Sequence, residues 1–451
     1  MDSLDQIVAQ FMKPNGPNHR PLQGPITLGA VNKDGTFEYV KSFDCANDKN
    51  IEQPSGKPIY HIASCTKLIT TIAVLQCVEK GLLALDSDIS NILTEFQNPK
   101  VLVRFDEDGD PVLEDSKGVV TLRHLLTHSS GMAYGFENMH PDLARLEKLR
   151  NRKTLEGGTV VRHPSDSPNF ALLLEIFGFD ITQQIVDAMY RRNLSNPYLY
   201  AIQGRNGSTP LVLIGLEKWF VYHEHSFLLV PNDFLNSSQV ERVNGGIKLG
   251  DYMQHHIFDP LGINDITFYS DRHDIQERLV QCWERSESEG LKKVRLSKRP
   301  YPAKEHFGGG GLFASATDLL KVYGAILRKD KKVLGKEMVD LMFKPQLQHT
   351  VGLDNLSDSH PSYRNSILNS IPTSTPINFG LGGLLNLQSV VGHRGSHSLT
   401  WSGMANCYWW IDPRNGIAGV YLSQMIPSGE PDAIALLSKF EETVYSSVAS
   451  K

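Results

Sequence analysis

The stretch HIASCTKLIT, residues 61–70, places a serine, Ser64, three residues before a lysine, Lys67. Apolar residues then continue at helical spacing, and Gly81 stands where a C-cap is expected. The pattern predicts a helix over residues 64–80. Because residues three positions apart lie on one face of a helix, the side-chain tips of Ser64 and Lys67 are expected to share the same space.

This pair of residues is suited to nucleophilic catalysis. A free serine hydroxyl is a poor nucleophile and needs a base beside it, and a lysine amine held out of water can act as that base. The first turn of a helix adds unpaired N–H groups and the positive end of the helix dipole, which stabilise a developing oxyanion. A Ser-x-x-Lys spacing also occurs by chance, however, and its other interpretation is a helix N-cap followed by a solvated lysine.

The composition is that of an ordinary globular protein with a large core: 451 residues, 40% of them hydrophobic and 21% charged. The net charge of −5, without a long Lys/Arg run, predicts no binding to nucleic acid or to an anionic membrane surface. The five cysteines are scattered without CxxC spacing, which argues against a disulfide framework or a structural zinc site. The N-terminus does not have the pattern of a signal peptide, and no apolar run reaches the ~18 residues of a membrane span. We therefore expect a soluble cytoplasmic protein without a metal or other cofactor.

Strand patterns occur near both ends of the chain, with helical patterns between them. A short helix near residues 4–11 precedes a hairpin over residues 26–43. The C-terminal part contains two strands between residues 398 and 424, and then a helix over residues 431–448. Two segments that both form strands at the chain ends can complete one sheet.

These patterns predict an α/β (α+β) fold. An antiparallel sheet flanked by helices is built from both chain ends, and a mainly helical domain is inserted into it. Residues 1–85 and 245–451 are expected to form the sheet domain, and residues 86–244 the inserted region.

Three further motifs follow the Ser-x-x-Lys motif in a fixed order. They are TLRHLLTHSSGM (121–132), GGGGLFASATDLL (308–320) and the strand SLTWSGM (398–404). Together the four motifs make the chain resemble the superfamily of serine β-lactamases and penicillin-binding proteins. Within it, the chain is most similar to the class C-like esterases and to the fungal acyltransferases of the lovastatin type. The resemblance runs from about residue 25 to residue 448.

The resemblance implies a role for each motif. Ser64 matches the acylated nucleophile and Lys67 its activating base. Trp401, Ser402 and Gly403 match the edge strand beside the active site and would contact the substrate, with Gly403 leaving room for an acyl chain. The backbone N–H groups of Ser64 and Met404 would form the oxyanion hole.

The resemblance also implies a catalytic tyrosine that shares protons with the serine and the lysine. The nearest match is Tyr222 in LIGLEKWFVYHEHS, with Tyr198 and Tyr200 as alternatives. This stretch departs from the family's pattern, because it has one extra residue after Trp219 and Glu224 stands where relatives have Asn. Residues 227–238 read as an insertion, and a displaced tyrosine would leave a protein that folds yet reacts poorly.

Two other stretches receive a structural interpretation. Glycines 308–311 do not precede Gly-Lys-[Ser/Thr], so we interpret them as a flexible loop near the active-site strand rather than a phosphate cradle. The histidines of GHRGSHS (392–398) have no third metal ligand that the sequence reveals. We interpret this second stretch as a polar loop at the pocket mouth, where Arg394 would bind a carboxylate or the phosphate of an acyl carrier.

The sequence thus predicts a serine acyltransferase (transesterase). It would move an acyl group from a thioester or ester donor to an alcohol of a secondary metabolite through a Ser64 acyl-enzyme. The partners would be a small-molecule acyl donor, an alcohol acceptor and an acyl carrier domain. Two alternatives remain open: an esterase or β-lactamase-like hydrolase, and an inactive relative that only binds a ligand.

Overall fold

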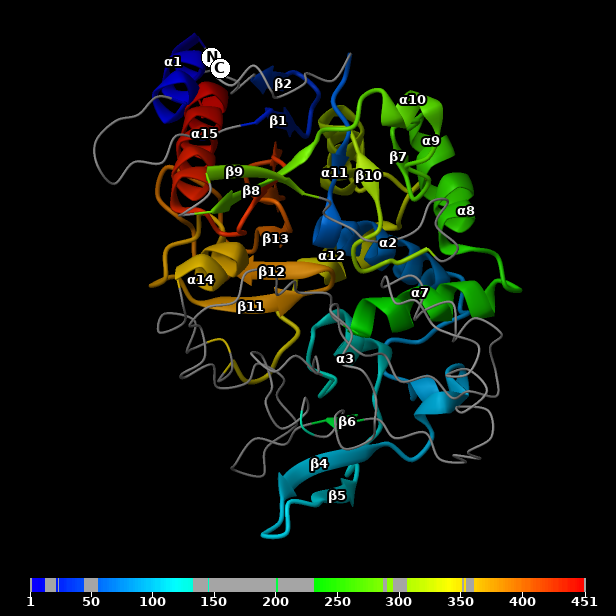
Figure 1. Ribbon diagram of the computed structural model, residues 1–451. Coiled ribbons are helices and arrows are strands. Elements are labelled where there is room, and N and C mark those ends of the chain that lie inside the picture. The colour runs from blue at the N-terminus through cyan, green and yellow to red at the C-terminus, as the bar shows by residue number, and fades with distance from the viewer. Residues whose placement is uncertain are drawn as a thin grey trace.

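A seven-stranded antiparallel sheet forms the centre of the computed structural model, in the order β11-β12-β13-β14-β15-β1-β2 (Figure 1). The residues that the structure describes are 2–12, 22, 24–43, 56–132, 145, 200–201, 231–286, 290–294, 306–350, 353 and 361–449. The strands of the large sheet are β1 (Ile26–Asn32), β2 (Glu38–Phe43), β11 (Ile377–Gly380), β12 (Gly383–Asn386), β13 (Leu399–Gly403), β14 (Cys407–Asp412) and β15 (Ile417–Leu422). Strand β1 pairs with β15, from Thr27 against Leu422 to Asn32 against Ile417. The prediction that the two chain ends build one antiparallel sheet is therefore confirmed.

Helices cover both faces of this sheet (Figure 1). Alternate residues of β14 show the two faces: Trp409 packs with helices α2 (Thr66–Glu79) and α11 (Ala316–Arg328), whereas Trp410 packs with α1 (Asp2–Phe11) and α15 (Pro431–Ala449). Successive strand residues point to opposite faces, so this alternation assigns a face to each side chain of the neighbouring strands. Helices α1 and α15 lie side by side, which brings the two chain ends together.

The remaining elements surround the large sheet. The other helices are α3 (Leu122–Leu126), α7 (Pro231–Val243), α8 (Leu249–Met253), α9 (Asp259–Leu261), α10 (His273–Gln276), α12 (Lys336–Met342) and α14 (Pro361–Leu368). Nine strands form three small sheets: β3 (Tyr60–His61) with β10 (Phe313–Ala314) and β7 (Ile266–Thr267); β16 (Met425–Ile426) with β8 (Cys282–Ser286) and β9 (Gly290–Val294); and β5 (Pro111–Asp115) with β4 (Lys100–Phe105) and β6 (Tyr200–Ala201).

The predicted opening helix forms with an irregular start. A 3-10 turn, Ala63–Cys65, carries Ser64, and α2 follows it from Thr66. Almost every residue of α2 is buried, Lys67 included, because the helix runs between the sheet and α7. Gly81 has a φ of 69° just beyond the helix, as expected of a C-terminal glycine.

Helix α7 gives the structure of part of the segment that reads as an insertion. Residues 227–238 read as an insertion in the sequence, and residues 231–243 form one continuous helix that packs against α2 and α3. Four polar residues of this helix, Asn236 to Gln239, are buried. At least this part of the segment belongs to the packed body of the molecule.

Most of residues 133–230 lie outside the described residues. The division into a sheet domain and a mainly helical insertion over residues 86–244 therefore stays a prediction. Among the residues that are described, no helix has the length and apolarity to cross a membrane.

Candidate active site

The backbone around Ser64 is strained and fixed from outside. Ala63 has a φ of 43°, a left-handed conformation that costs a non-glycine residue about 1–3 kcal/mol. One backbone hydrogen bond joins Ile62 and Leu312, from the Ile62 N–H to the Leu312 carbonyl over 3.1 Å. The Leu312 N–H in turn donates to Thr66 Oγ1 over 3.1 Å. The segment that precedes β10 thus holds the turn in which Ser64 lies.

Ser64 and Lys67 are brought together as the helical spacing predicts. Lys67 Nζ lies 3.2 Å from Ser64 Oγ, and the two residues are 3% and 7% exposed. The helix N-cap is Cys65 rather than Ser64. Both parts of the alternative interpretation, an N-cap serine and a solvated lysine, are therefore wrong.

The glycine-rich loop holds the lysine from another part of the chain. Lys67 Nζ donates to the carbonyl of Gly309 over 2.6 Å, and Thr70 Oγ1 donates to the carbonyl of Gly308 over 2.7 Å. The Gly308 N–H donates to Ser237 Oγ of α7 over 3.1 Å. The loop was expected to be flexible and to lie near the active-site strand. The four glycines are buried, and the loop is bonded along α2, where its backbone carbonyls accept hydrogen bonds from polar side chains of the helix.

Gly403 lies where β13 passes the turn that carries Ser64. A Cβ atom at this position would meet the Ile62 carbonyl oxygen at 2.2 Å and Cys65 Sγ at 3.0 Å. A glycine was expected here because it leaves room for an acyl chain. The structure gives another reason: the protein's own backbone at Ile62 fills the space that a Cβ atom of residue 403 would need.

Trp401 contributes an aromatic surface next to this turn. Its side chain is 6% exposed and stacks on His128 with ring centroids 5.4 Å apart and planes 11° apart. Phe379 packs against the same tryptophan at 5.7 Å. Sequence reasoning missed His128, although it lies in the motif TLRHLLTHSSGM; the motif served only as a landmark, because nothing local reveals a contact with residue 401.

Ser402 points away from Trp401 and Gly403. In the ladder it stands opposite Tyr408, which packs with α1 and α15, whereas Trp401 stands opposite Trp409 of the other face. The side chain of Ser402 therefore does not lie beside Ser64, because alternate residues of a strand face opposite sides, and a substrate contact of Ser402 stays a prediction for its backbone alone. Strand β13 is also not an edge strand along its whole length, since β12 pairs with its residues Leu399 and Thr400.

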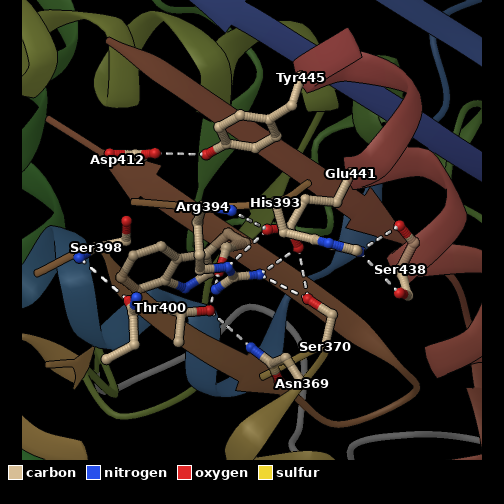
Figure 2. A network of polar contacts seen from close by, with 12 residues as sticks. Asn369, Ser370, His393, Arg394, Ser398, Thr400, Asp412, Ser438, Glu441 and Tyr445 are labelled. Atoms are coloured by element: carbon tan, nitrogen blue, oxygen red, sulfur yellow. Dashed lines mark hydrogen bonds and ion pairs between the residues drawn. The ribbon is translucent and has the colours of Figure 1, made fainter. Parts of the chain in front are cut away.

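Arg394 is not at a pocket mouth. It is 1% exposed, and its Nε and Nη2 atoms donate to the two carboxylate oxygens of Glu441 over 2.9 and 2.7 Å. Figure 2 shows the pair facing each other, with Ser370 beside them donating to the same carboxylate. Glu441 belongs to α15, on the face of the sheet opposite α2. The predicted role of Arg394 in binding substrate or a carrier phosphate is therefore corrected to a buried ion pair.

The ion pair governs the protonation of Glu441. Burial by itself raises the pKa of this carboxyl, but the charge of Arg394 and the hydrogen bonds from Arg394 and Ser370 outweigh burial and hold the pKa below the ordinary 4.5. The neighbouring His393 places its Nε2 3.0 Å from Ser438 Oγ. Among the described residues no His, Cys, Asp and Glu cluster could hold a metal ion.

Two cysteines near Ser64 are unsuited to nucleophilic attack. Burial raises the pKa of the Cys65 thiol well above its ordinary value, and it raises the pKa of Cys407 to about 12. Since the thiolate is the reactive form, both side chains are packed thiols.

Two predicted parts of the site remain, the second residue of the oxyanion hole and the catalytic tyrosine. Met404 begins the turn between β13 and β14, directly after Gly403. Tyr222 and the alternative Tyr198 lie outside the described residues, and Tyr200 is described only as backbone of β6. The catalytic tyrosine therefore stays a prediction.

Comparison with known proteins matches two segments of the chain to one family. Residues 4–190 and 238–440 match the Beta-lactamase family. The unmatched residues 191–237 include Tyr222. The family match thus covers the segments that carry Ser64, Lys67, the glycine loop and β13.

Three similar proteins have related activities in their names. The lovastatin esterase of Penicillium rubens is 31% identical over 461 residues, 99% of this chain and 98% of that protein. The ML-236A carboxylate methylbutanoyltransferase of Penicillium citrinum is 28% identical over 439 residues, 95% of this chain and 91% of that protein. The unliganded structure of simvastatin synthase from Aspergillus terreus has a TM-score of 0.73 at 26% identity, with 99% of this chain and 97% of that one covered. The chain therefore belongs to the beta-lactamase family, which confirms the resemblance predicted from the order of its four motifs.

Proposed function

We propose that this protein is a serine acyltransferase that moves an acyl group from a thioester or ester donor to an alcohol of a secondary metabolite. The observation that carries the proposal is the buried pair of Ser64 and Lys67, with Nζ 3.2 Å from Oγ. The choice of reaction is supported by the methylbutanoyltransferase similar to this chain.

In the first half of the reaction, Ser64 Oγ forms a bond to the acyl carbon while its proton passes to the amine of Lys67. The C–S or C–O bond of the donor then breaks, and the leaving thiol or alcohol takes the proton from Lys67. The hydrogen bond from Lys67 to the Gly309 carbonyl supports this role, because it keeps the amine beside Ser64 in both protonation states.

In the second half, an alcohol attacks the acyl carbon and gives its proton to Lys67; the bond between the acyl carbon and Ser64 Oγ then breaks, and Oγ takes that proton from Lys67 to restore the hydroxyl. The N–H groups of Ser64 and Met404 would stabilise the oxyanion in both halves. Tyr222 is proposed to share the proton with Lys67. Trp401, stacked on His128, would form an apolar wall for the acyl chain or the acceptor.

The donor is proposed to be a small thioester, either free or carried on an acyl carrier domain. Arg394 gives no support for binding of a carrier domain, because its guanidinium group is paired with the Glu441 carboxylate. A comparison of the same acyl group on a free thiol and on a carrier domain would distinguish the two donors by their kcat/KM values.

Hydrolysis is the second candidate. It is favoured by one specific observation, the lovastatin esterase that is 31% identical to this chain along nearly its whole length. A hydrolase and a transferase share the acyl-enzyme and differ only in whether water or an alcohol discharges it.

The test is the mass of the intact protein after brief exposure to a methylbutanoyl thioester of a small thiol. We expect a gain of one acyl group on the peptide that contains Ser64, and no gain in Ser64→Ala. The exposed Ser87→Ala is the matched control and should acylate like the wild type.

The fate of the adduct then separates the candidates. Loss of the adduct that depends on added alcohol, with formation of the new ester, supports the transferase. Loss at the same rate with and without alcohol supports the hydrolase. A wild type that forms no adduct, even with a reactive aryl ester, overturns both and leaves the interpretation as a binding protein.

A further inference from the structure

The turn that joins β13 to β14 has an unusual backbone. Its residues are Met404, Ala405 and Asn406, and the last two have φ values of 67° and 58°. Asparagine adopts this left-handed conformation readily, but an alanine pays about 1–2 kcal/mol for it. The surrounding structure must therefore hold the turn in place.

The side chain of Asn406 provides that hold. It is 1% exposed, and its amide makes five hydrogen bonds. Nδ2 donates to the carbonyls of Met425 (2.8 Å) and Pro427 (3.0 Å), and Oδ1 accepts from the N–H of Gly429 (2.8 Å), the N–H of Glu430 (3.3 Å) and the hydroxyl of Tyr408 (2.6 Å). Both donor hydrogens and the acceptor oxygen of the amide are thus fully used.

These bonds tie the turn to β16 and to residues 427–430, which join β16 to α15. The backbone N–H of Met425 also donates to the Ala405 carbonyl over 3.4 Å. Met404 packs on the small apolar cluster of Cys282, Ala405 and Ile426. The turn is therefore fixed from behind by a wall that contains none of the proposed catalytic groups.

The front of the same turn faces the nucleophile. Gly403 lies against the carbonyl of Ile62, two residues before Ser64. Within the described residues the Met404 N–H donates no backbone hydrogen bond. The direction of this N–H is that of the peptide plane between Gly403 and Met404, where the chain enters the turn, and the hydrogen bonds of Asn406 anchor the other end of the same turn.

We propose that Asn406 is a positioning residue that aims the Met404 N–H into the oxyanion hole. This inference rests on the proposed function, because it takes Ser64 to be the nucleophile and Met404 to be a donor. Asn406 acts through the turn and does not touch the reacting atoms. An oxyanion-hole donor that is removed costs about 10²–10³-fold in kcat, so a misdirected donor has a measurable effect.

The test compares two esters of the same acid, an aryl oxoester and the matching aryl thionoester. The oxygen of the first becomes an oxyanion that accepts hydrogen bonds, whereas the sulfur of the second is larger and a weak acceptor. A donor that is misdirected therefore slows the oxoester more than the thionoester. General damage to the protein slows both equally.

The decisive variant is Asn406→Gly, since glycine keeps the left-handed conformation without strain and removes only the amide. We expect kcat/KM for the oxoester to fall about 10²-fold, with a much smaller fall for the thionoester. Tyr408→Phe removes one of the five bonds and should shift the ratio in the same direction by less. The exposed, left-handed Asn98 supplies the control Asn98→Gly, which should leave the ratio unchanged.

Each other outcome is informative. An unchanged ratio in Asn406→Gly and Tyr408→Phe, whether both rates fall together or neither falls, overturns the positioning role. A wild type that reacts with neither ester overturns the proposed function, and the inference with it. The two failures are distinguished by the activity of the wild type itself.

Discussion

Lys67 donates a hydrogen bond to the carbonyl oxygen of Gly309 over 2.6 Å, a contact between residues 242 positions apart in the chain. The bond fixes the amine at a backbone atom, and Ser64 Oγ lies 3.2 Å from the same amine. A base that is held in this manner keeps its position when its proton moves. The glycine loop is therefore part of the active-site structure, although it supplies no reacting side chain.

The first prediction concerns the base. Lys67→Met keeps most of the side-chain volume and removes the amine, so the rate of Ser64 acylation should fall by about 10²–10⁴-fold. Lys80→Met is the matched control at the C-cap of the same helix, because Lys80 Nζ donates to the Tyr252 hydroxyl and lies over the Tyr252 ring, away from Ser64. Stopped-flow acylation with an aryl ester measures both. A Lys67→Met protein that acylates at the wild-type rate would show that another group is the base.

The second prediction concerns the loop. In Gly308→Ala the new Cβ would lie 2.2 Å from Ser237 Oγ and 2.8 Å from Thr70 Oγ1. Overpacking of a filled site costs about 1–3 kcal/mol and displaces its neighbours, so both the free energy of unfolding and the acylation rate should fall. Thermal unfolding and the acylation assay together give the two effects.

Two further variants make the loop prediction specific. Gly308→Ala combined with Ser237→Ala removes the closest contact and should recover part of both losses. Gly118→Ala adds a methyl group where no atom lies within 4 Å, and it should behave as the wild type. Equal behaviour of Gly308→Ala and Gly118→Ala would mean that the loop yields without consequence.

The features that could be predicted from the sequence are the local ones. The spacing of Ser64 and Lys67 follows from helix geometry, and the turn after β14 follows from Asp412, which accepts hydrogen bonds from the N–H groups of Arg414 and Asn415. Strands β11 and β12 were missed because they are buried almost throughout and show no alternation of apolar and polar residues.

The long-range partners could not be read from the sequence. Nothing near Arg394 reveals a carboxylate 47 positions away, and nothing near Trp401 reveals His128. Ser402 is different. Side chains alternate along a strand, so the sequence alone could have placed the Ser402 side chain on the face of the sheet opposite to that of Trp401. Tyr222 is a prediction from resemblance, and the structure leaves it as one.

The third prediction concerns the buried ion pair. Glu441→Gln leaves Arg394 without its counter-charge, which should lower the free energy of unfolding by about 3–5 kcal/mol. Since the pair lies across the sheet from Ser64, the acylation rate per folded molecule should stay unchanged. Chemical denaturation and the acylation assay measure the two quantities. Lys439→Gln, which removes an exposed ion pair with Glu442, is the control and should change the stability by less than about 1 kcal/mol.

The difference in stability between the wild type and Glu441→Gln should depend on pH, and the sign of this dependence follows from the pKa of Glu441. The pKa of Glu441 is held below its ordinary value of 4.5 in the folded protein, so the pair stabilises the fold at pH values above 4.5. The stabilisation is lost as the pH falls through the lowered pKa. The gap in melting temperature between wild type and Glu441→Gln should therefore be widest near neutral pH and narrow in acid. A gap that is constant with pH would show that the charge of Glu441 does not carry the effect.

The fourth prediction concerns His306, which precedes the glycine loop. The residue is 3% exposed, its Nδ1 accepts from the Gly250 N–H over 2.8 Å, and its ring stacks on Phe268 at 4.8 Å. Burial, with a further contribution from the charge of Lys248, lowers the pKa of the imidazole to about 4, while Asp251 opposes this shift. The folded protein therefore keeps His306 neutral over a pH range in which the unfolded chain protonates it.

Between pH 6.5, the ordinary value, and pH 4 the unfolded chain binds a proton that the folded protein does not. The contribution of His306 should consequently lower the stability of the wild type as the pH falls across this range, and this one contribution should level off below pH 4. His306→Gln can still accept from the Gly250 N–H and does not titrate, so its melting temperature should fall less over the same interval. His255→Gln, at an exposed position of the neighbouring helical segment, should follow the wild type. Parallel curves for the wild type and His306→Gln from pH 7 to pH 4 would mean that the buried imidazole carries none of the acid sensitivity.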